Sequence, residues 1–357
     1  MSIRKRTFQT CIGGYAGCGN LGDDAILLGY LQQIEPAYDT RRIVVLSGRP
    51  RMDTRRFGVK CVNRKNPLAI LSALLRSERF LCGGGSLLQN TTGMLSLFYY
   101  LSLLLLAKLC GCRVSLLASG IGPLKGRLSQ DVTAFVLNRL HSVQLRDGDS
   151  YRLLLSMGVR RELLSIAPDP ALFLPSPPPS RLPYLKKEAR LAQSEGYVCV
   201  VLRAPEASAS TTLQKITGAL RILCEQHKLS IVYLLFSPAL DKPTTERLQK
   251  KLGGRIARLR EPADALAWLE GCELLLAMRL HALVLSVLAN TPALGISASL
   301  HEQKLDSFCR AAGIPHLYAQ DTSIVSLTHE LEQLLLNRQK IRARLPSIAE
   351  ELRCENA

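Results

Sequence analysis

Short apolar runs alternate with amphipathic stretches along almost the whole chain. The apolar runs predict buried strands at 7–15, 43–46, 80–82, 113–118, 141–145, 164–167, 197–202, 230–236, 273–277 and 292–296. The stretches between them predict helices at 25–34, 68–75, 94–109, 131–139, 150–157, 213–226, 244–252, 263–271 and 284–289, with a last, basic helix at 324–345. A strand followed by a helix, repeated in this way, is typical of parallel α/β sheets.

A proline-rich run at 175–180, PSPPPS, divides this pattern into two blocks. With 357 residues the chain is long for one core and sufficient for two. We therefore expect two Rossmann-like α/β domains facing a central cleft. Their expected limits are 1–174 for the N-terminal domain, 175–195 for a proline-rich hinge, 196–323 for the C-terminal domain and 324–357 for a basic C-terminal helix.

The net charge of +17 favours anionic partners, which include phosphates, anionic lipid headgroups and nucleic acid. Nine basic residues and one acid lie between 41 and 65, directly before the apolar helix expected at 68–75. Such a segment is either a solvated face or a surface that rests on anionic lipid. Aromatic side chains do not alternate with these charges, so we expect no nucleic-acid partner.

The eleven cysteines are odd in number and form no C-x-x-C pair, which is typical neither of zinc sites nor of disulfide frameworks. We expect reduced cysteines, a cytoplasmic protein and no bound metal. No apolar segment follows the basic residues at 4–6, and the apolar run at 94–109 is shorter than a membrane span.

An arginine and a histidine, Arg279 and His281, stand where the strand at 273–277 gives way to a helix. The carboxyl ends of parallel strands are the usual ligand sites of α/β sheets. Arg279 carries a permanent charge that suits phosphate or carboxylate, and His281 can transfer protons near neutral pH. The pair therefore indicates chemistry on an anionic substrate. The alternative is a salt bridge for the arginine and a backbone hydrogen bond for the histidine.

Two glycine-rich turns follow predicted strands in the first block, at 13–24 (GGYAGCGNLGDD) and at 83–86 (GGGS). Glycines allow close backbone approach to a ligand, and helix starts attract anions. The first turn contains a G-x-G-x-x-G match at 17–22, but the next strand ends in Ser47-Gly48-Arg49 without the acid of a dinucleotide site. We therefore do not expect NAD. The structural alternatives are helix-start roles for the two aspartates at 23 and 24, and tight packing for the GGGS turn.

Seven segments together resemble the polysaccharide pyruvyl transferase family, in particular its bacterial CsaB type. They are GYAGCGNLGDDAIL (14–27), GGGSLLQ (83–89), ASGIGPL (118–124), LRDGDSY (145–151), PDPAL (168–172), MRLHAL (278–283) and KLDSF (304–308). The resemblance implies a fold similar to GT-B glycosyltransferases. It also implies transfer of the enolpyruvyl group of phosphoenolpyruvate to a sugar as a cyclic ketal, without a further cofactor. In the CsaB type the acceptor is an N-acetylmannosamine residue of a polyprenyl-diphosphate-linked cell-wall precursor.

The resemblance also assigns roles to residues of this chain. His281 is the implied general acid, and Arg146, Arg279 and Lys304 are implied to hold the anionic donor. The implied acceptor-binding residues are Gly17, Asn20, Asp23, Asp24, Gly84, Gly85 and Ser86. Asp169 is expected to hold its own loop.

Two departures from the family pattern concern this site. Ala277 replaces a common glycine, and the loop at 297–304 reads SASLHEQK where the family has Ser-Tyr-Asp-Pro-Lys. The second departure bears on the position of Lys304 and on acceptor specificity.

The sequence leaves two other classes of function open. A GT-B glycosyltransferase that uses a nucleotide sugar would have the same fold, because fold does not fix function. A non-catalytic module could bind lipid-linked glycan or nucleic acid. For the pyruvyl transferase we expect a peripheral position at the cytoplasmic face of the membrane, where the basic segment meets anionic lipid or the acceptor's diphosphate. The oligomeric state stays open.

Overall fold

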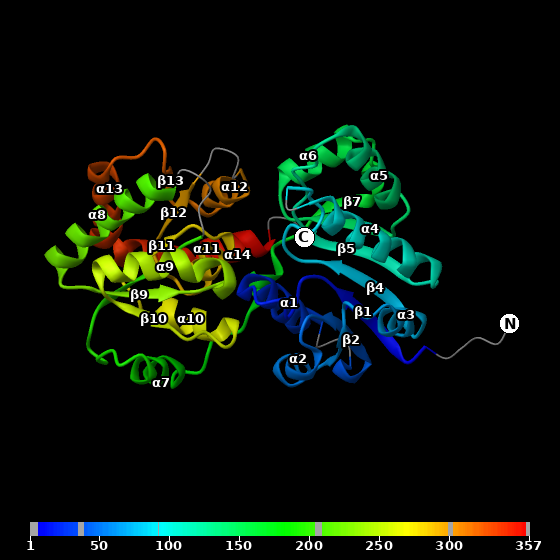
Figure 1. The fold of residues 1–357 in the computed structure, drawn as a ribbon, viewed down its shortest axis with the longest axis horizontal. Coiled ribbons are helices and arrows are strands. Elements are labelled where there is room, and N and C mark those ends of the chain that lie inside the picture. Colours follow the sequence, from blue (N-terminus) through cyan, green and yellow to red (C-terminus); the bar gives the residue numbers. More distant parts are fainter. Residues whose placement is uncertain (1–5, 35–38, 92, 204–208, 299–302, 355–357) are drawn as a thin grey trace. The chain divides into compact units, whose positions relative to one another are not determined.

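The computed structural model describes residues 6–34, 39–91, 93–203, 209–298 and 303–354. It forms two compact units, an N-terminal unit that ends at Phe173 and a C-terminal unit at Leu174–Arg353. Each unit contains one parallel sheet covered by helices (Figure 1). Each is described by itself below.

The N-terminal sheet has seven parallel strands in the order β3-β2-β1-β4-β5-β6-β7. The strands are β1 Phe8–Gly13, β2 Ile43–Ser47, β3 Lys60–Asn63, β4 Ser77–Gly83, β5 Arg113–Ser119, β6 Ser142–Leu145 and β7 Leu164–Ile166. The helices are α1 Leu21–Ile34, α2 Pro50–Phe57, α3 Pro67–Leu75, α4 Met94–Leu109, α5 Arg127–Leu137 and α6 Gly148–Ser156. Short 3₁₀ turns are η1 Thr40–Arg42, η2 Arg161–Leu163 and η3 Pro170–Phe173.

The C-terminal sheet has six parallel strands in the order β10-β9-β8-β11-β12-β13. The strands are β8 Tyr197–Val201, β9 Ser230–Leu234, β10 Arg255–Ala257, β11 Leu275–Ala277, β12 Ala293–Ser297 and β13 His316–Tyr318. The helices are α7 Arg181–Glu188, α8 Ala209–His227, α9 Pro238–Leu252, α10 Pro262–Glu270, α11 Leu280–Leu288, α12 Gln303–Ala312, α13 Ile324–Leu336 and α14 Arg338–Cys354. Both strand orders are those of Rossmann sheets, so the expected fold class of two Rossmann-like domains is confirmed.

The helices of the N-terminal unit divide between the two faces of its sheet. Side chains of α3, α4, α5 and α6 share one buried cluster with β4, β5 and β6, whereas α1 and α2 pack with β1 and β2 in a second cluster. Right-handed crossovers explain this division, because the chain moves outward from β1 to β3 and then in the opposite direction from β4 to β7. The basic helix α2 and the apolar helix α3 therefore lie on opposite faces, so the segment at 41–75 does not form the single surface expected from its sequence.

Local sequence explains where helices begin. Asn66 caps α3 by accepting hydrogen bonds from the N–H groups of Leu68 and Ala69, with Pro67 at the first helical position. Asp147 caps α6 by accepting from the N–H of Ser150 at 2.7 Å.

Within the described ranges, no helix is both long and apolar enough to cross a bilayer.

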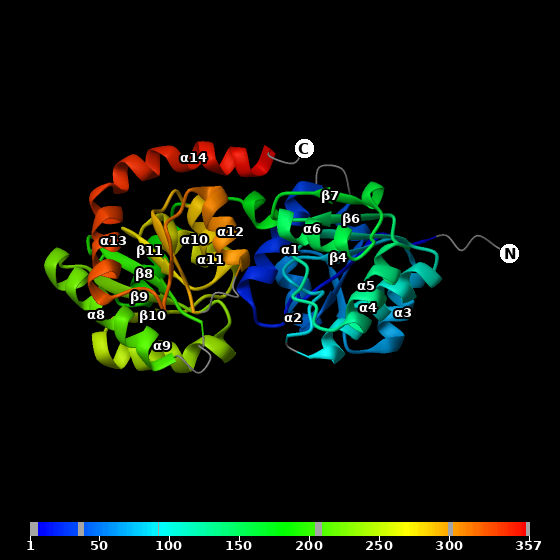
Figure 2. The ribbon, with the colours of Figure 1, turned by 90° about the horizontal axis from the view of Figure 1, so that it is seen from above.

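The structure differs from the expected domain plan in two places. The segment expected as a hinge at 175–195 contains α7, which is tied to α10 by the ion pairs of Arg181 with Glu261 at 2.6 Å and Asp264 at 2.5 Å. The single C-terminal helix expected at 324–357 is two helices, α13 and α14 (Figure 2). They meet at Asn337, whose side chain donates to the carbonyl of Gln333 at 2.8 Å and so competes with the backbone.

Candidate functional site

The strand order reverses at one position in each sheet, between β1 and β4 in the N-terminal unit and between β8 and β11 in the C-terminal unit. Loops diverge at such a switch point and leave room for a ligand beside the carboxyl ends of the strands. Most of the residues singled out by the sequence lie there. The glycine-rich turns follow β1 and β4, and Arg279 and His281 follow β11.

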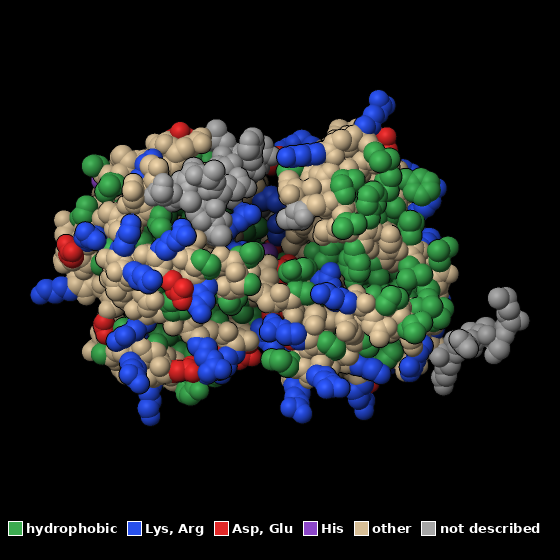
Figure 3. All heavy atoms as spheres, in the orientation of Figure 1, with side chains coloured by type: hydrophobic (Ala, Val, Ile, Leu, Met, Phe, Trp, Pro, Cys, Tyr) green, Lys and Arg blue, Asp and Glu red, His purple; other side chains and the backbone are tan. Residues whose placement is uncertain are grey.

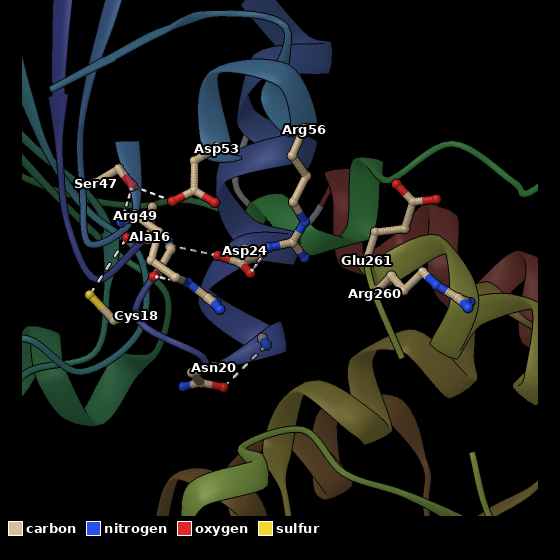
Figure 4. A network of polar contacts seen from close by, with 12 residues as sticks. Ala16, Cys18, Asn20, Asp24, Ser47, Arg49, Asp53, Arg56, Arg260 and Glu261 are labelled. Carbon is tan, nitrogen blue, oxygen red and sulfur yellow. Dashed lines mark hydrogen bonds and ion pairs between the residues drawn. The ribbon is translucent and has the colours of Figure 1, made fainter. Parts of the chain in front are cut away.

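Asp24 anchors the glycine-rich turn after β1 (Figure 4). One carboxylate oxygen accepts from the N–H of Gly17 at 2.9 Å, and the other pairs with Nη1 of Arg56 at 2.6 Å. Asp24 is buried, and burial raises the pKa of its carboxyl although Arg56 and the Gly17 N–H act in the opposite direction. Asp24 lies in the first turn of α1, as the structural alternative expected, and its contacts also hold the glycine-rich turn.

Gly17 lies against the end of β2 and the start of α2. Its φ is +68°, and a Cβ atom would lie 1.9 Å from a carboxylate oxygen of Asp53, which accepts a short hydrogen bond from Ser47. Arg49 donates from Nε to the carbonyl of Gly17 at 3.0 Å. Figure 4 shows Ser47, Arg49 and Asp53 grouped beside Asp24. Only glycine fits at position 17, because a side chain there would clash with Asp53.

Asn20, Asp23 and the GGGS turn meet between β1 and β4. Asn20 donates to the carboxylate of Asp23 and accepts from the N–H of Gly22 at 3.2 Å. A Cβ atom on Gly85 would lie 2.6 Å from an oxygen of Asp23. A largely apolar pocket is present here, and its lining includes Gly13, Gly14, Tyr15, Asp23, Ile26, Tyr30, Gly83 and Gly84. The structure therefore brings together Asn20, Asp23, Gly84 and Gly85, four of the residues that the sequence assigned to the acceptor.

Arg146 connects the ends of three strands of the same sheet. Its guanidinium donates to Oγ of Ser86 at 3.2 Å and to a carboxylate oxygen of Asp169 at 3.4 Å. The other oxygen of Asp169 accepts from the N–H of Ala171 at 3.0 Å. The Arg146 side chain is largely buried, and Asp147 lies 3.9 Å from its Nε. Ser86, Arg146 and Asp169, which are far apart in the sequence, thus form one polar cluster.

In the C-terminal unit, β11 gives way to α11 where the sequence predicted it. Arg279 is the N-cap residue of α11, and His281 lies half-buried in its first turn. The N–H groups and the partial positive charge of a helix start favour an anion. A fixed cation and a proton carrier therefore occupy the same helix start.

Arg279 forms the salt bridge that the sequence left open as an alternative to a substrate contact, with a partner that the sequence did not identify. Its Nε lies 2.9 Å from one carboxylate oxygen of Asp241 and 3.1 Å from the other, and its Nη2 makes a further short contact. Asp241 is fully buried in the first turn of α9 and also accepts from the N–H of Ser237 at 2.7 Å. Because β8 lies between β9 and β11, the pair links two loops across the end of β8. An acid three residues after the helix-starting Pro238 was the available signal.

Lys304 lies in the first turn of α12, next to a hydrogen-bonded chain that the sequence also did not reveal. His316 contacts Asp306 through Nδ1 at 3.2 Å and Ser297 through Nε2 at 2.9 Å. The order Ser–His–Asp is that of a hydrolase triad, but Ser297 is fully buried and no substrate can reach it. The chain instead ties β12, β13 and α12 together. The altered loop residues 299–302 lie outside the described residues.

The three residues implied to hold the donor and the implied general acid are divided between the units. Arg279, His281 and Lys304 belong to the C-terminal unit, and Arg146 belongs to the N-terminal unit. In the part of the chain that the structure describes, no three His, Cys, Asp or Glu side chains gather as metal ligands would.

Comparison with known proteins identifies the family. The sequence profile described as polysaccharide pyruvyl transferase matches residues 20–299, which include the end of the first glycine-rich turn, the whole GGGS turn, Arg146, Arg279 and His281. No curated protein sequence matches the chain.

Solved structures share the fold over almost the whole chain. A UDP co-structure of S. aureus MnaA has a TM-score of 0.65 at 13% identity, covering 97% of this chain and 92% of its own. A glycosyltransferase from Rickettsia africae has a TM-score of 0.64 at 9% identity, covering 97% and 94%. Anabaena HepE in complex with UDP has a TM-score of 0.62 at 12% identity, covering 97% and 96%. At these identities the similarity establishes a fold of the GT-B kind and nothing finer.

Proposed function

The chain belongs to the polysaccharide pyruvyl transferase family, and we propose that it moves the enolpyruvyl group of phosphoenolpyruvate onto a saccharide as a cyclic ketal, with release of phosphate. The observation that carries this proposal is the position of Arg279 and His281 at the start of α11, inside the matched region and at the switch point of a Rossmann sheet. A trianionic donor needs fixed cations, and its methylene carbon needs an acid.

In the proposed reaction His281 donates a proton to the methylene carbon of phosphoenolpyruvate. The C2 carbon then becomes electrophilic, its bond to the phosphate oxygen breaks, and two sugar hydroxyls form bonds to it. One hydroxyl proton returns to His281 and the other leaves with phosphate, so that atoms and charge balance. Fixed cations hold the donor throughout, and the proposed chemistry uses no metal or other cofactor.

Arg279 supports this chemistry from a rigid position, because Asp241 fixes its guanidinium. The start of α11 adds backbone N–H groups for a donor anion. We assign Lys304 and Arg146 to the donor as well. Asp169 orients Arg146, and the chain formed by Ser297, His316 and Asp306 orients the helix that carries Lys304.

The proposed acceptor is a lipid-linked saccharide that contains N-acetylmannosamine. Asn20, Asp23 and the turn formed by Gly84, Gly85 and Ser86 line the end of the N-terminal sheet and offer carboxylate, amide and backbone groups for sugar hydroxyls. Asp24 and Gly17 hold the glycine-rich turn after β1 in place. A net charge of +17 supports a peripheral position at the cytoplasmic face of an anionic membrane.

A second candidate is glycosyl transfer from a nucleotide sugar. It is favoured by the similar structures of MnaA and HepE, which are complexes with UDP. The two reactions leave different products, because pyruvyl transfer releases phosphate and glycosyl transfer releases a nucleoside diphosphate.

The test incubates the protein with phosphoenolpyruvate or with UDP sugars, with and without a lipid-linked N-acetylmannosamine acceptor. Phosphate release that depends on the acceptor, with a pyruvyl ketal found on the acceptor by mass spectrometry, supports the proposal. Release of UDP with sugar transfer supports the second candidate and contradicts the first. Turnover from phosphoenolpyruvate should survive treatment with EDTA.

A further inference from the structure

Three neighbouring helices of the N-terminal unit carry exposed apolar side chains. Helices α3, α4 and α5 lie in this order on one face of the sheet and bury their inner sides in a common core. Their outer sides carry the residues that we call the apolar face: Leu68, Leu75, Leu95, Phe98, Leu109, Leu128 and Phe135. Figure 3 shows hydrophobic side chains gathered over α4 and α5. Soluble surfaces rarely leave such a contiguous patch without a partner.

Helical spacing places these side chains on the same outward side. Leu95, Phe98 and Leu109 are separated by multiples of three to four residues along α4, and Leu128 and Phe135 are seven apart on α5. Leu95 and Leu109 are 86% and 85% exposed. These two side chains project from the surface and do not line a groove. Projecting leucines insert into a lipid bilayer more readily than into a rigid protein pocket.

Basic residues lie on and beside the three helices that carry the apolar face, and we call them the basic rim. The segments 66–76, 94–113 and 125–139, which form the three helices and their ends, contain one acid, Asp131, and six exposed basic residues: Arg76, Lys108, Arg113, Lys125, Arg127 and Arg139. Asp131 lies 4.0 Å from Arg127 and is partly neutralised by it. Exposed leucines with lysines and arginines on the same helices match the acyl boundary and the anionic headgroups of a lipid bilayer.

We infer that the apolar face of α3, α4 and α5 docks this protein on an anionic lipid bilayer. This inference rests on the proposed function, because a lipid-linked acceptor requires the enzyme to work at a membrane. It assigns the membrane contact to a different surface from the basic segment at 41–65, whose helix α2 lies on the opposite face of the sheet. A second copy of the chain fits the face poorly, since a symmetric dimer would press the same basic rim against itself.

The test measures sedimentation of the full chain with phosphatidylcholine vesicles that contain or lack phosphatidylglycerol. The wild-type protein should bind only the anionic vesicles, and binding should weaken with salt. The double variant Leu95→Gln, Leu109→Gln should lower the partition coefficient at least about tenfold. Its matched control is Val325→Gln, Leu336→Gln on α13, where the side chains are 79% and 68% exposed. The control should remain within about twofold of wild type.

A second set of variants tests whether vesicle binding depends on the basic rim itself or only on the net charge of the protein. Lys125→Glu with Arg127→Glu should weaken vesicle binding clearly more than Arg51→Glu with Arg55→Glu on α2, although both pairs change the net charge equally. The inference would be overturned if the two glutamate pairs lost vesicle binding equally, or if the two glutamine pairs did so. It would also be overturned if the wild-type protein did not bind anionic vesicles. A concentration-dependent dimer that Leu95→Gln, Leu109→Gln dissolves would show that the face binds a second copy instead.

The outcome is separate from that of the proposed function. Vesicle binding needs no substrate, so a protein that binds vesicles and releases no phosphate would refute only the proposed reaction. A protein that pyruvylates a water-soluble acceptor and ignores vesicles would refute only the docking face. Circular dichroism of each variant confirms that the fold is retained.

Discussion

In the proposed reaction His281 and Arg279, which are two residues apart at the start of α11, have different tasks. Arg279 carries a fixed positive charge, and Asp241 sets the orientation of its guanidinium. His281 lies one residue into the helix, half-buried, where a donor anion at the N–H groups would also lie. Neither residue alone distinguishes catalysis from structure, but their shared location at a switch point favours catalysis.

Replacing His281 with glutamine should lower the rate of acceptor-dependent phosphate release by about 10²- to 10⁴-fold, because the general acid is lost. The KM for phosphoenolpyruvate should change little, since Arg279 and the helix start remain. The matched control is His329→Gln on the exposed side of α13, which should keep wild-type rates. A His281→Gln variant with near-normal turnover would place the acid elsewhere.

Asp241 should matter for stability more than any exposed acid of the same helix. Asp241→Asn leaves the largely buried Arg279 without its counter-charge, and we expect a loss of about 3 kcal/mol in the free energy of unfolding. The control is Glu246→Gln, which removes an exposed pair with Lys242 at 3.7 Å and should cost less than about 1 kcal/mol. Urea denaturation of both variants checks this, and equal losses would contradict the assigned role of the pair.

Asp24 gives a pH dependence of defined sign. Its pKa in the folded protein is raised above 3.8 by burial, so the fold favours the protonated form. Its contribution to stability is present at low pH and is lost as pH rises from about 4 through the folded pKa. Wild type should therefore lose free energy of unfolding relative to Asp24→Asn as the pH rises above about 4.

Asp39 serves as the comparison, because its pKa is shifted in the opposite direction to that of Asp24. Hydrogen bonds from Arg41 lower its pKa below 3.8, so its contribution falls away only below that value. The difference between wild type and Asp39→Asn should be flat above about pH 4. A flat or rising difference for Asp24→Asn in the same urea titrations would contradict the assigned burial effect.

At the scale of elements, the turn after β4 is shaped by its contact with the start of α1. Gly85 has a φ of +70°, and a Cβ atom there would lie 2.6 Å from the carboxylate of Asp23. Gly85→Ala should therefore displace Asp23 and raise the KM for the acceptor, with KM for phosphoenolpyruvate unchanged. Gly19→Ala is the control, because φ is +85° there but no atom lies within 4 Å. Equal effects of the two changes would show that backbone strain alone is responsible.

The sequence predicts most of the elements because their hydrophobic runs are strong. The strands at the centre of each sheet are buried on both faces and read as continuous apolar runs, as β8, β11 and β12 illustrate. Edge strands such as β3 and β10 are short and partly exposed, so their patterns are weak. The sequence did not predict them, nor the short helix α2, whose residues are mostly charged.

The sequence predicted which strand ends carry the candidate site, but it did not predict which acidic side chains pair with its arginines. Arg279 and His281 could be placed because β11 and α11 are adjacent in the sequence. The partners Asp241 and Asp169 lie 38 and 23 residues from their arginines, and only the strand order brings them together. The same limit applies to α2 and α3, which are consecutive in sequence but lie on opposite faces because the crossover direction reverses between them.

At the scale of the whole molecule, the two sheets have the same strand order but carry different groups at their switch points. The N-terminal unit presents glycines, the carboxylate of Asp23 and the guanidinium of Arg146, while the C-terminal unit presents Arg279 and His281. In the proposed reaction the saccharide binds at the N-terminal sheet, and Arg146, Arg279 and His281 act on the anionic donor. The inferred docking of the apolar face on α3, α4 and α5 would place the N-terminal unit at the bilayer.

Activity should depend on that face only when the acceptor is in a membrane. We expect Leu95→Gln, Leu109→Gln to lower turnover of a vesicle-embedded acceptor about tenfold, because less enzyme is bound to the vesicles. Turnover of a water-soluble acceptor with a short lipid should stay at the wild-type level. A parallel loss with both acceptors would indicate damage to the active site and not to membrane binding.

The most direct test of the central claim is pyruvyl transfer from phosphoenolpyruvate in deuterated water, followed by mass spectrometry of the acceptor. Protonation of the methylene carbon by His281 predicts one solvent-derived deuterium in the methyl group of each ketal, with one phosphate released per ketal. An unlabelled methyl group, or an acceptor that gains no pyruvyl ketal while wild-type protein is folded and supplied with a lipid-linked saccharide, would contradict the account.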